Sequence, residues 1–350
     1  MKNFRRIAAL LFCLIFIFSF AGCKKNKKPE ETTTKATTEA PKPADYNPLT
    51  GEDDFNKDCI GKRPVAITIQ NSEARCRPQW GLCAPDIVIE GEVEYTATKY
   101  LWLFSDVSKV EKSGPFRSVR RDFVELAEGF DAILIHCGWS SGSSIGAAEY
   151  LNSTGYDHID GLVRFGNVAP NGSVGAGQEY CSYTTSELIT EGIEKRDIRT
   201  DTDSAYLHPF DFYDKATDLE GGKCSAIAFR VGNNDAKFTY DADEGRYFGS
   251  YFGTAMKDNE GTPYGVTNVI VLYITSITYP DGYRCDMDLS KGTGILASNG
   301  TYQEITWTKG EGKDMIKLMD KDGKGIKINK GKSYIALCRL SNADKTEITE

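Results

Sequence analysis

The second half of the sequence consists largely of short strand-like segments separated by turn signals, and this pattern limits the folds that the chain can adopt. Alternating or wholly apolar runs occupy residues 226–231, 237–240, 247–251, 269–274, 301–307, 316–319, 326–328 and 334–338. The residue pairs that favour tight turns here are Asn233-Asn234, Asp281-Gly282, Asn299-Gly300 and Asp322-Gly323. Because such pairs commonly connect neighbouring antiparallel strands, this half should be mainly antiparallel β structure.

The first half mixes strand and helix periodicities. Runs typical of buried strands occupy residues 63–69, 86–90, 100–104 and 131–136, whereas a helical spacing of apolar residues occupies 121–130, 145–151 and 184–195. We therefore predict an α+β protein, a layered sandwich with a mixed α/β N-terminal domain and a mainly antiparallel β C-terminal domain. The predicted domains cover residues 46–215 and 216–345.

The chain begins with a pattern that is typical of export. Three basic residues lie within the first six positions, and residues 7–20 form an apolar run broken only by Ser19. This run falls short of the ~18–20 residues that a membrane-spanning helix needs. It ends in Phe20-Ala21-Gly22-Cys23, which resembles a lipobox. We predict a signal peptide over residues 1–22 and lipidation of Cys23. An uncleaved N-terminal anchor is the alternative, and it also places the chain outside the cytoplasmic membrane.

Residues 23–45 have the composition of a tether. Four lysines follow Cys23 closely, and residues 29–45 contain mainly Glu, Thr, Lys, Ala and Pro without any aromatic side chain. Such a segment buries too little apolar surface to offset its ordering entropy, and the lysines suit anionic lipid headgroups. We predict a disordered tether and a lipid-anchored protein on the extracytoplasmic face of the cell membrane. Its first partner is then the bilayer, through the acylated Cys23.

Composition argues against several function classes. The net charge of −8 argues against nucleic acid as a partner, because nonspecific binding requires a basic face. Eight of the ten cysteines lie in the folded region without CxxC spacing. An oxidising location permits disulfides between them, and buried free thiols are the alternative. The three histidines are scattered, at His136, His158 and His208. We predict no metal site and no cofactor.

Two arginines form the most informative polar feature. Arg117 and Arg120 are spaced three apart after Gly114-Pro115, so both can lie on one face of the first turn of a helix, beside its free N–H groups. Two guanidinium groups in this position suit a carboxylate or a phosphate. The alternative is a structural network in which they pair with Glu90 and Glu94.

Other side chains are expected to join the same cleft. His136 ends the strand that follows the arginines and can converge on them, with Asn71 or Gln79 nearby. The predicted ligand-binding residues are Arg117, Arg120, His136, Asn71 and Gln79.

One segment matches a hydrolase motif. Residues 138–142 read Gly-Trp-Ser-Ser-Gly between a predicted strand and a predicted helix, which is the context of a nucleophile elbow at Ser140. A hydrolase also needs an acid and a downstream histidine, and neither His158 nor His208 is well spaced for that role. We therefore assign no catalytic residue and keep an envelope hydrolase, using Ser140 or an Arg/His site, as the alternative function.

The folded region resembles a known family over nearly its whole length. The segments that carry the resemblance are residues 47–51, 63–67, 74–82, 86–88, 114–120, 130–133, 136–140, 240–241, 268–271, 292–294, 307–309 and 322–323. The most specific are Gly114-Pro115-Phe116-Arg117-Ser118-Val119-Arg120 and His136-Cys137-Gly138-Trp139-Ser140. They resemble the YerB-like lipoproteins, which are built from the paired N- and C-terminal domains of unknown function called DUF3048.

The resemblance implies a layered α+β fold and a membrane-tethered extracellular protein, and it carries no reaction with it. The sequence departs from the family pattern at Tyr180-Cys181, where His-Asn is usual, and at Lys99, where Arg is common. The combined features favour a non-catalytic binding protein of the cell envelope that recognises an anionic small molecule, a glycan or an envelope protein. A scaffold that uses its β-rich half for protein contacts is a third hypothesis.

The lipobox interpretation predicts the outcome of a labelling experiment. Cells that produce the wild-type chain should incorporate labelled fatty acid into it, and the Cys23→Ala variant should incorporate none, because the acylated thiol is absent. Equal labelling of the two proteins would show that Cys23 is not the lipidation site.

Overall fold

The computed structural model describes residues 41–142, 144–174 and 177–350. The predicted signal peptide, the lipidation site Cys23 and most of the predicted tether lie outside these residues. The described residues belong to one compact unit, Ala40–Glu350.

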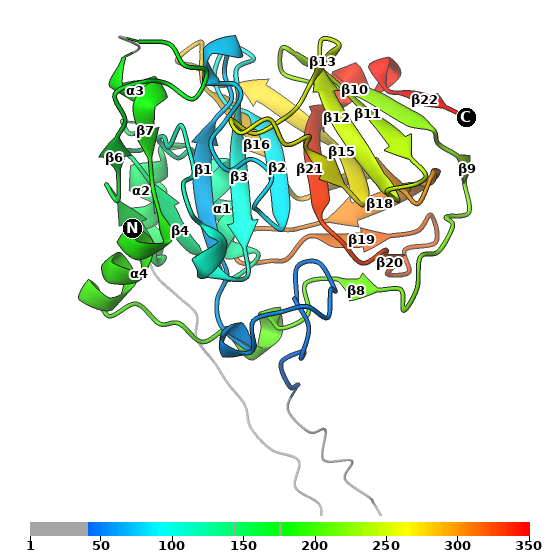
Figure 1. Cartoon of the computed structure of the whole chain (residues 1–350), viewed down its shortest axis with the longest axis horizontal. Helices are drawn as coiled ribbons and strands as arrows, with labels where there is room; N and C mark the ends of the chain where they lie inside the picture. The colour runs from blue at the N-terminus through cyan, green and yellow to red at the C-terminus, as the bar shows by residue number, and fades with distance from the viewer. Residues whose placement is uncertain (1–40, 143, 175–176) are drawn as a thin grey trace, which may run out of the picture. The chain divides into compact units, whose positions relative to one another are not determined.

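Twelve strands within the described ranges form the main sheet (Figure 1). Along the sheet the order is β19-β18-β17-β15-β21-β2-β3-β1-β4-β5, with β16 paired to β15 and β9 paired to β18. These strands are β1 (Val65–Gln70), β2 (Ile87–Glu92), β3 (Thr98–Phe104), β4 (Ile133–His136), β5 (His158–Asp160), β9 (Gly222–Lys223), β15 (Asn268–Thr278), β16 (Cys285–Asp288), β17 (Lys291–Ser298), β18 (Thr301–Thr308), β19 (Lys317–Met319) and β21 (Ser333–Arg339).

The two halves of the sequence meet in the middle of this sheet. β2 pairs in parallel with β21, in a register that places Val88 opposite Tyr334 and Glu90 opposite Ala336. Strands from both sides of residue 215 therefore share one hydrogen-bonded sheet. A division of the chain into domains at that position stays a prediction.

A second sheet comes from the second half of the chain. Its order is β13-β12-β11-β10-β22, with β14 paired to β12. Its strands are β10 (Ala226–Val231), β11 (Asn234–Asp241), β12 (Arg246–Tyr251), β13 (Thr254–Ala255), β14 (Gly265–Val266) and β22 (Glu347–Thr349). Two small pairs complete the strands, β6 (Arg164–Phe165) with β7 (Ser182–Tyr183), and β8 (Asp211–Phe212) with β20 (Lys327–Ile328).

Within the described residues, the α-helices all lie before residue 215, where the periodicities predict them. They are α1 (Arg121–Glu128), α2 (Ala147–Thr154), α3 (Gln178–Cys181) and α4 (Ser186–Lys195). The hydroxyl of Thr185 accepts a hydrogen bond from the backbone N–H of Leu188 and so caps the N-terminus of α4. Within the described part of the chain, no helix is long and apolar enough to cross a membrane.

Alternate side chains of the main sheet enter two apolar cores, because successive residues of a strand point to opposite faces. Leu101 and Leu103 of β3 share one core with Phe123 of α1. Trp102 shares the other core with Phe229 of the second sheet. The protein is therefore α+β, with a predominance of strands, and the more specific expectation of a layered sandwich stays a prediction.

A buried carboxylate lies between the main sheet and the second sheet. Glu90 of β2 is fully inaccessible to solvent. Its Oε1 accepts hydrogen bonds from Asn71 Nδ2 at 2.8 Å, from Thr98 Oγ1 at 2.7 Å and from Asn234 Nδ2 at 2.8 Å. Its Oε2 accepts a hydrogen bond from the hydroxyl of Tyr251 at 2.8 Å.

A second tyrosine completes the set of donors. The hydroxyl of Tyr334 in β21 also donates to Glu90 Oε2 and lies 3.0 Å from the hydroxyl of Tyr251. An uncompensated buried charge costs several kcal/mol, and here five donors replace the water that the carboxylate has lost. We name Glu90, Asn71, Thr98, Asn234, Tyr251 and Tyr334 the Glu90 network. It joins strands from both halves of the sequence.

The Glu90 network predicts a large loss of stability when its acceptor is removed. Glu90→Leu should lower the free energy of unfolding by about 3–5 kcal/mol, because buried amides and hydroxyls lose their partner. Urea denaturation monitored by tryptophan fluorescence measures this change. The control is Glu244→Leu, which removes a surface carboxylate paired with Arg246 and should cost less than about 1 kcal/mol. Similar losses in the two variants would contradict the role given to Glu90.

Candidate functional site

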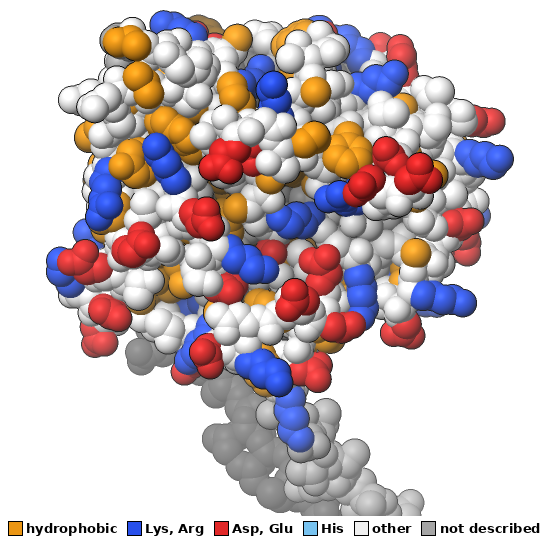
Figure 2. Space-filling model, in the orientation of Figure 1, with side chains coloured by type: hydrophobic (Ala, Val, Ile, Leu, Met, Phe, Trp, Pro, Cys, Tyr) orange, Lys and Arg blue, Asp and Glu red, His pale blue; other side chains and the backbone are white. Residues whose placement is uncertain are grey.

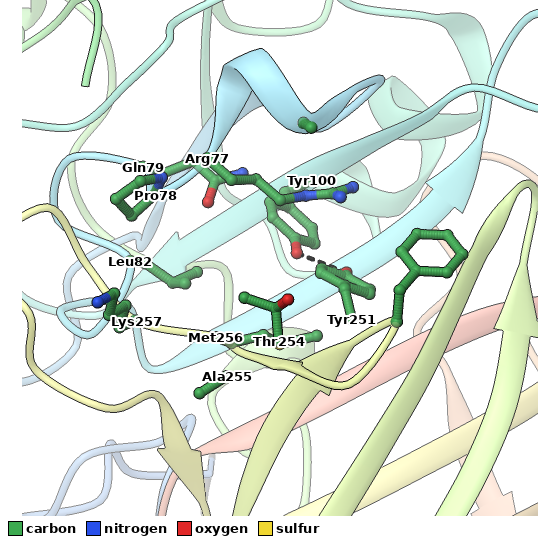
Figure 3. Close-up of a pocket in the computed structure, with 12 residues that line it drawn as sticks. Arg77, Pro78, Gln79, Leu82, Tyr100, Tyr251, Thr254, Ala255, Met256 and Lys257 are labelled. Atoms are coloured by element: carbon green, nitrogen blue, oxygen red, sulfur yellow. Dashed lines mark hydrogen bonds between the residues drawn. The ribbon is translucent and has the colours of Figure 1, made fainter. Parts of the chain in front are cut away.

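A cavity of about 270 Å³ opens beside the Glu90 network (Figure 3). One wall comes from residues 74–82, which follow β1, and from Tyr100 of β3. The opposite wall comes from residues 251–257, which include the end of β12, β13 and the segment after it. The cavity therefore lies between the first and the second half of the sequence, and ligand sites are common at such junctions.

Arg77 places a guanidinium group at the cavity wall. Its Nε donates to Asn71 Oδ1 at 2.8 Å, and its Nη2 donates to the Asn71 carbonyl and to Asn234 Oδ1. The guanidinium carbon lies 4.3 Å from the centre of the Tyr251 ring. These contacts fix the group in one orientation. They also leave Nη1 without a hydrogen-bond acceptor among the described residues, so it can serve a ligand.

Two further polar side chains line the cavity. Gln79 donates through Nε2 to Asn71 Oδ1 at 3.1 Å, and its carbonyl accepts the backbone N–H of Asn259 at 3.1 Å. Its amide oxygen forms no hydrogen bond within the described ranges. Lys257 is exposed and has no salt-bridge partner in the described part of the chain. The site thus offers two cationic groups and one amide.

Much of the remaining lining is apolar. Its lining includes Pro78, Leu82, Ala255 and Met256. Phe252 lies beside Tyr251 with 60% of its surface exposed and a backbone φ of 49°, a conformation that side chains other than glycine rarely adopt. Apolar walls with a few fixed polar groups are the usual composition of a small-molecule site.

The tyrosines of the cavity are suited to binding and not to proton abstraction. Burial and the neighbouring Glu90 charge raise the pKa of Tyr100 and the pKa of Tyr251 well above the ordinary value. Their hydroxyls lie 2.6 Å apart and stay protonated near neutral pH. These two tyrosines therefore do not act as general bases, and their hydroxyls belong to the hydrogen bonds around Glu90.

The five residues predicted to bind a ligand fall into three groups. Asn71 and Gln79 lie together, at and behind the cavity wall. Arg120 is the N-cap residue of α1 and Arg117 lies in the segment before it, and neither lines the cavity. His136 forms a separate group. Ligand binding by any of them stays a prediction.

The arginines have carboxylate partners. Arg120 forms an ion pair with Glu94, as the structural alternative predicted, and Arg117 lies 3.5 Å from Glu179. Glu90 is held by amides and hydroxyls instead of arginine.

His136 pairs with His158. The His136 Nε2 lies 2.9 Å from His158 Nδ1, and the His136 Nδ1 lies 2.9 Å from the carbonyl of Gly138. Burial is the main cause that lowers the pKa of His136 from 6.5 to about 4, against the opposing effect of Asp160. His136 is therefore neutral at physiological pH and adds no positive charge to an anion site.

Ser140 has the contacts of a structural residue. Its hydroxyl accepts the backbone N–H of Ala147 at 3.0 Å, at the start of α2, and its backbone N–H donates to the carbonyl of Val119. Among the described residues, no histidine forms a hydrogen bond with Ser140. The geometry provides no base beside this hydroxyl.

Cysteines and acidic residues do not gather into a metal site. Within the described ranges, no three His, Cys, Asp or Glu side chains lie close enough to hold a metal ion. Among the described residues, Cys76, Cys224 and Cys338 are buried free thiols, and Cys59, Cys83, Cys137 and Cys285 are free thiols that are partly exposed. The buried-thiol interpretation therefore describes the first three side chains.

Three residues of the cavity were missed from the sequence. Arg77 precedes Gln79 by two positions, so its closeness to a predicted site residue in the sequence could have identified it. Phe252 and Lys257 lie in a hairpin segment whose position depends on the pairing of β12 with β13, so no local signal identifies them. On the face shown in Figure 2, acidic and basic side chains are interspersed, so surface charge alone does not identify a site.

Comparisons with known proteins place the chain in a family. The DUF3048 N-terminal domain, described as a protein of unknown function, matches residues 49–199, and the DUF3048 C-terminal domain matches residues 226–335. The YerB protein of Bacillus subtilis (strain 168), whose name describes it as a candidate lipoprotein, is 28% identical over 346 residues. That match covers 96% of this chain and 95% of the relative.

A solved structure supports the same assignment. The crystal structure of the YerB protein from Bacillus subtilis superposes with a TM-score of 0.72 at 29% sequence identity, covering 87% of this chain and 99% of that one. The match thus extends across both halves and the sheet that joins them. The chain belongs to the YerB-like family, whose members combine the N- and C-terminal DUF3048 domains.

Proposed function

We propose that this protein is a non-catalytic binding protein, tethered by acylated Cys23 to the extracytoplasmic face of the cell membrane. The relative named as a candidate lipoprotein supports the tether, as does the export pattern at the start of the sequence. The cavity between residues 74–82 and 251–257 is the proposed ligand site.

The fixed guanidinium of Arg77 is the observation that carries this proposal. It is held by Asn71 and Asn234 and lies against Tyr251. A guanidinium that is already ordered loses little conformational entropy when it binds an anion. The apolar walls formed by Leu82 and Met256 suit an apolar body. The proposed ligand is therefore a small amphipathic molecule with an anionic end.

A hydrolase receives less support from the geometry. The Ser140 hydroxyl accepts a backbone N–H, and the buried histidine pair lies outside the cavity lining. Among the described residues, no histidine or carboxylate forms a hydrogen bond with the Ser140 hydroxyl, and the cavity lining contains neither type of side chain.

A fluorescent probe with the proposed chemistry tests the cavity. The probe 8-anilinonaphthalene-1-sulfonate combines an aromatic body with a sulfonate. Native wild-type protein should bind it saturably at one site. Ala255→Trp should weaken this binding about tenfold or more, because the indole fills a cavity of about 270 Å³. Ala205→Trp, at another exposed alanine, is the matched control and should bind like the wild type.

A comparison of a charged and a neutral probe tests whether the ligand is anionic. Wild-type protein should bind the sulfonate probe more tightly than the neutral analogue N-phenyl-1-naphthylamine, and Lys257→Met should reduce that difference. Equal affinity of the Ala255→Trp and Ala205→Trp variants for the sulfonate probe would contradict the proposed site. No preference for the sulfonate in the wild type would contradict an anionic ligand.

A further inference from the structure

A lysine is buried on the face of the main sheet opposite the cavity. Lys99 lies in β3, and only 4% of its surface is exposed. Its neighbour Tyr100 lines the cavity, and consecutive strand residues point to opposite faces. The Lys99 Nζ donates to Gln70 Oε1 at 2.6 Å. No carboxylate within the described ranges forms a salt bridge with it.

Two arginines of the segment before α1 act on this lysine. Burial is the largest cause that lowers the pKa of Lys99 from 10.5 to about 7, and the charges of Arg120 and Arg117 add to it, while Glu94 opposes the shift. Arg117 belongs to the segment that follows Phe116, and its backbone N–H donates to the carbonyl of Thr68 in β1. Arg120 is the N-cap residue of α1.

These three cations have more donor groups than the protein satisfies. Lys99 has three N–H groups and one protein acceptor, Gln70. The Arg117 Nε is buried and has no hydrogen-bond partner among the described residues. Arg120 uses Nε on Glu94 and Nη1 on Ser118 and Val119, and its Nη2 has no acceptor in the described part of the chain. Of these groups, the Arg117 Nε is the buried donor without an acceptor among the described residues. Such donors are rare in folded proteins because each costs free energy.

The three cations also have fewer nearby carboxylates than positive charges, which favours a bound anion. Of the nearby carboxylates, Glu94 forms an ion pair with Arg120, and Glu179 lies 3.5 Å from Arg117 with a half-exposed side chain. Lys99, the most buried of the three cations, has no carboxylate partner within the described ranges. An additional anion would compensate both the charge and the free donors.

We propose that Lys99, Arg117 and Arg120 form a second ligand site, which binds the tetrahedral oxyanion of a phosphate ester. Lysine contributes a compact charge, and each arginine contributes a planar fork. The site lies where β1 ends and where α1 begins, and the partial positive charge at the N-terminus of α1 adds to the three side chains. It is separate from the cavity in Figure 3, so the two sites can be tested independently.

This site makes anion binding depend on pH. The groups that act on Lys99 are Arg117, Arg120, Glu94 and Cys76, and a bound oxyanion adds an opposing negative charge that favours the protonated amine. Affinity should be highest below about pH 7 and should fall as the pH rises and unliganded Lys99 loses its proton. Sulfate is the suitable probe for this dependence, because it stays a dianion across the range.

Calorimetric titration of the full chain with sodium sulfate tests the proposal, with sodium chloride used to keep the ionic strength constant. Lys99→Met and Arg117→Gln should each lower sulfate affinity about tenfold or more. Lys317→Met is the control, because it removes an exposed lysine of β19 that lies outside both proposed sites, and it should leave sulfate affinity unchanged. Glycerol phosphate should compete with sulfate and bind more tightly than inorganic phosphate if the natural ligand is an ester.

The pH series gives a second, independent measurement. Wild-type affinity for sulfate should fall between pH 6 and pH 9, and Lys99→Arg should bind sulfate with little change over that range, since arginine keeps its proton. Failure of the wild type to bind sulfate or glycerol phosphate would overturn the proposal. Equal sulfate affinity of the wild type, Lys99→Met and Arg117→Gln would overturn it as well.

Discussion

A carboxylate that is removed from water must find hydrogen-bond donors in the protein, and Glu90 finds them on several different elements. Thr98 comes from β3 and Tyr334 from β21, whereas Asn234 and Tyr251 come from the second sheet. No single hairpin could supply these groups. The second sheet must therefore pack against the main sheet in one register, because a shift would leave the buried charge without its donors. The cavity is formed beside this junction.

Sequence patterns predicted much of the strand and helix content, and the failures have a physical cause. The run at 226–231 matches β10, and the predicted helix at 184–195 contains α4. In contrast, β17 was missed because Gly292 and Gly294 resemble loop residues. A Cβ atom at Gly292 would lie 2.3 Å from the carbonyl of Tyr273, so the neighbouring strand requires glycine at this position. Such close approaches depend on pairing between distant segments, which local periodicity does not report.

The candidate site was only partly predictable, because it is also formed by segments that lie far apart in the sequence. Gln79 lines the cavity and donates to Asn71 behind it, whereas Arg117 and Arg120, which were predicted beside them, do not line this cavity. The spacing of Arg117 and Arg120 predicted that both lie in the first turn of a helix, and this was wrong. α1 begins at Arg121, so Arg120 is its N-cap residue and Arg117 lies in the segment before it. The position of Lys99 could have been used for prediction. A lysine inside an otherwise apolar strand must be buried or must find a partner, so it is a candidate for a polar site. Which partners it finds depends on Gln70 of β1, which lies 29 residues earlier in the sequence.

The two proposed sites depend on the same stretch of backbone, although they use opposite faces of it. Gln70 contacts Lys99, and the next residue, Asn71, holds Arg77 and donates to Glu90. β1 and β3 are paired from Val65 opposite Phe104 to Gln70 opposite Lys99, so their relative position is fixed by a full ladder of backbone hydrogen bonds. A rigid sheet of this kind can position both sites with little movement of either. We therefore infer that occupancy of one site leaves the affinity of the other largely unchanged, because coupling requires an element with two alternative arrangements. β1 and β3 are continuous paired strands and give no indication of a second arrangement.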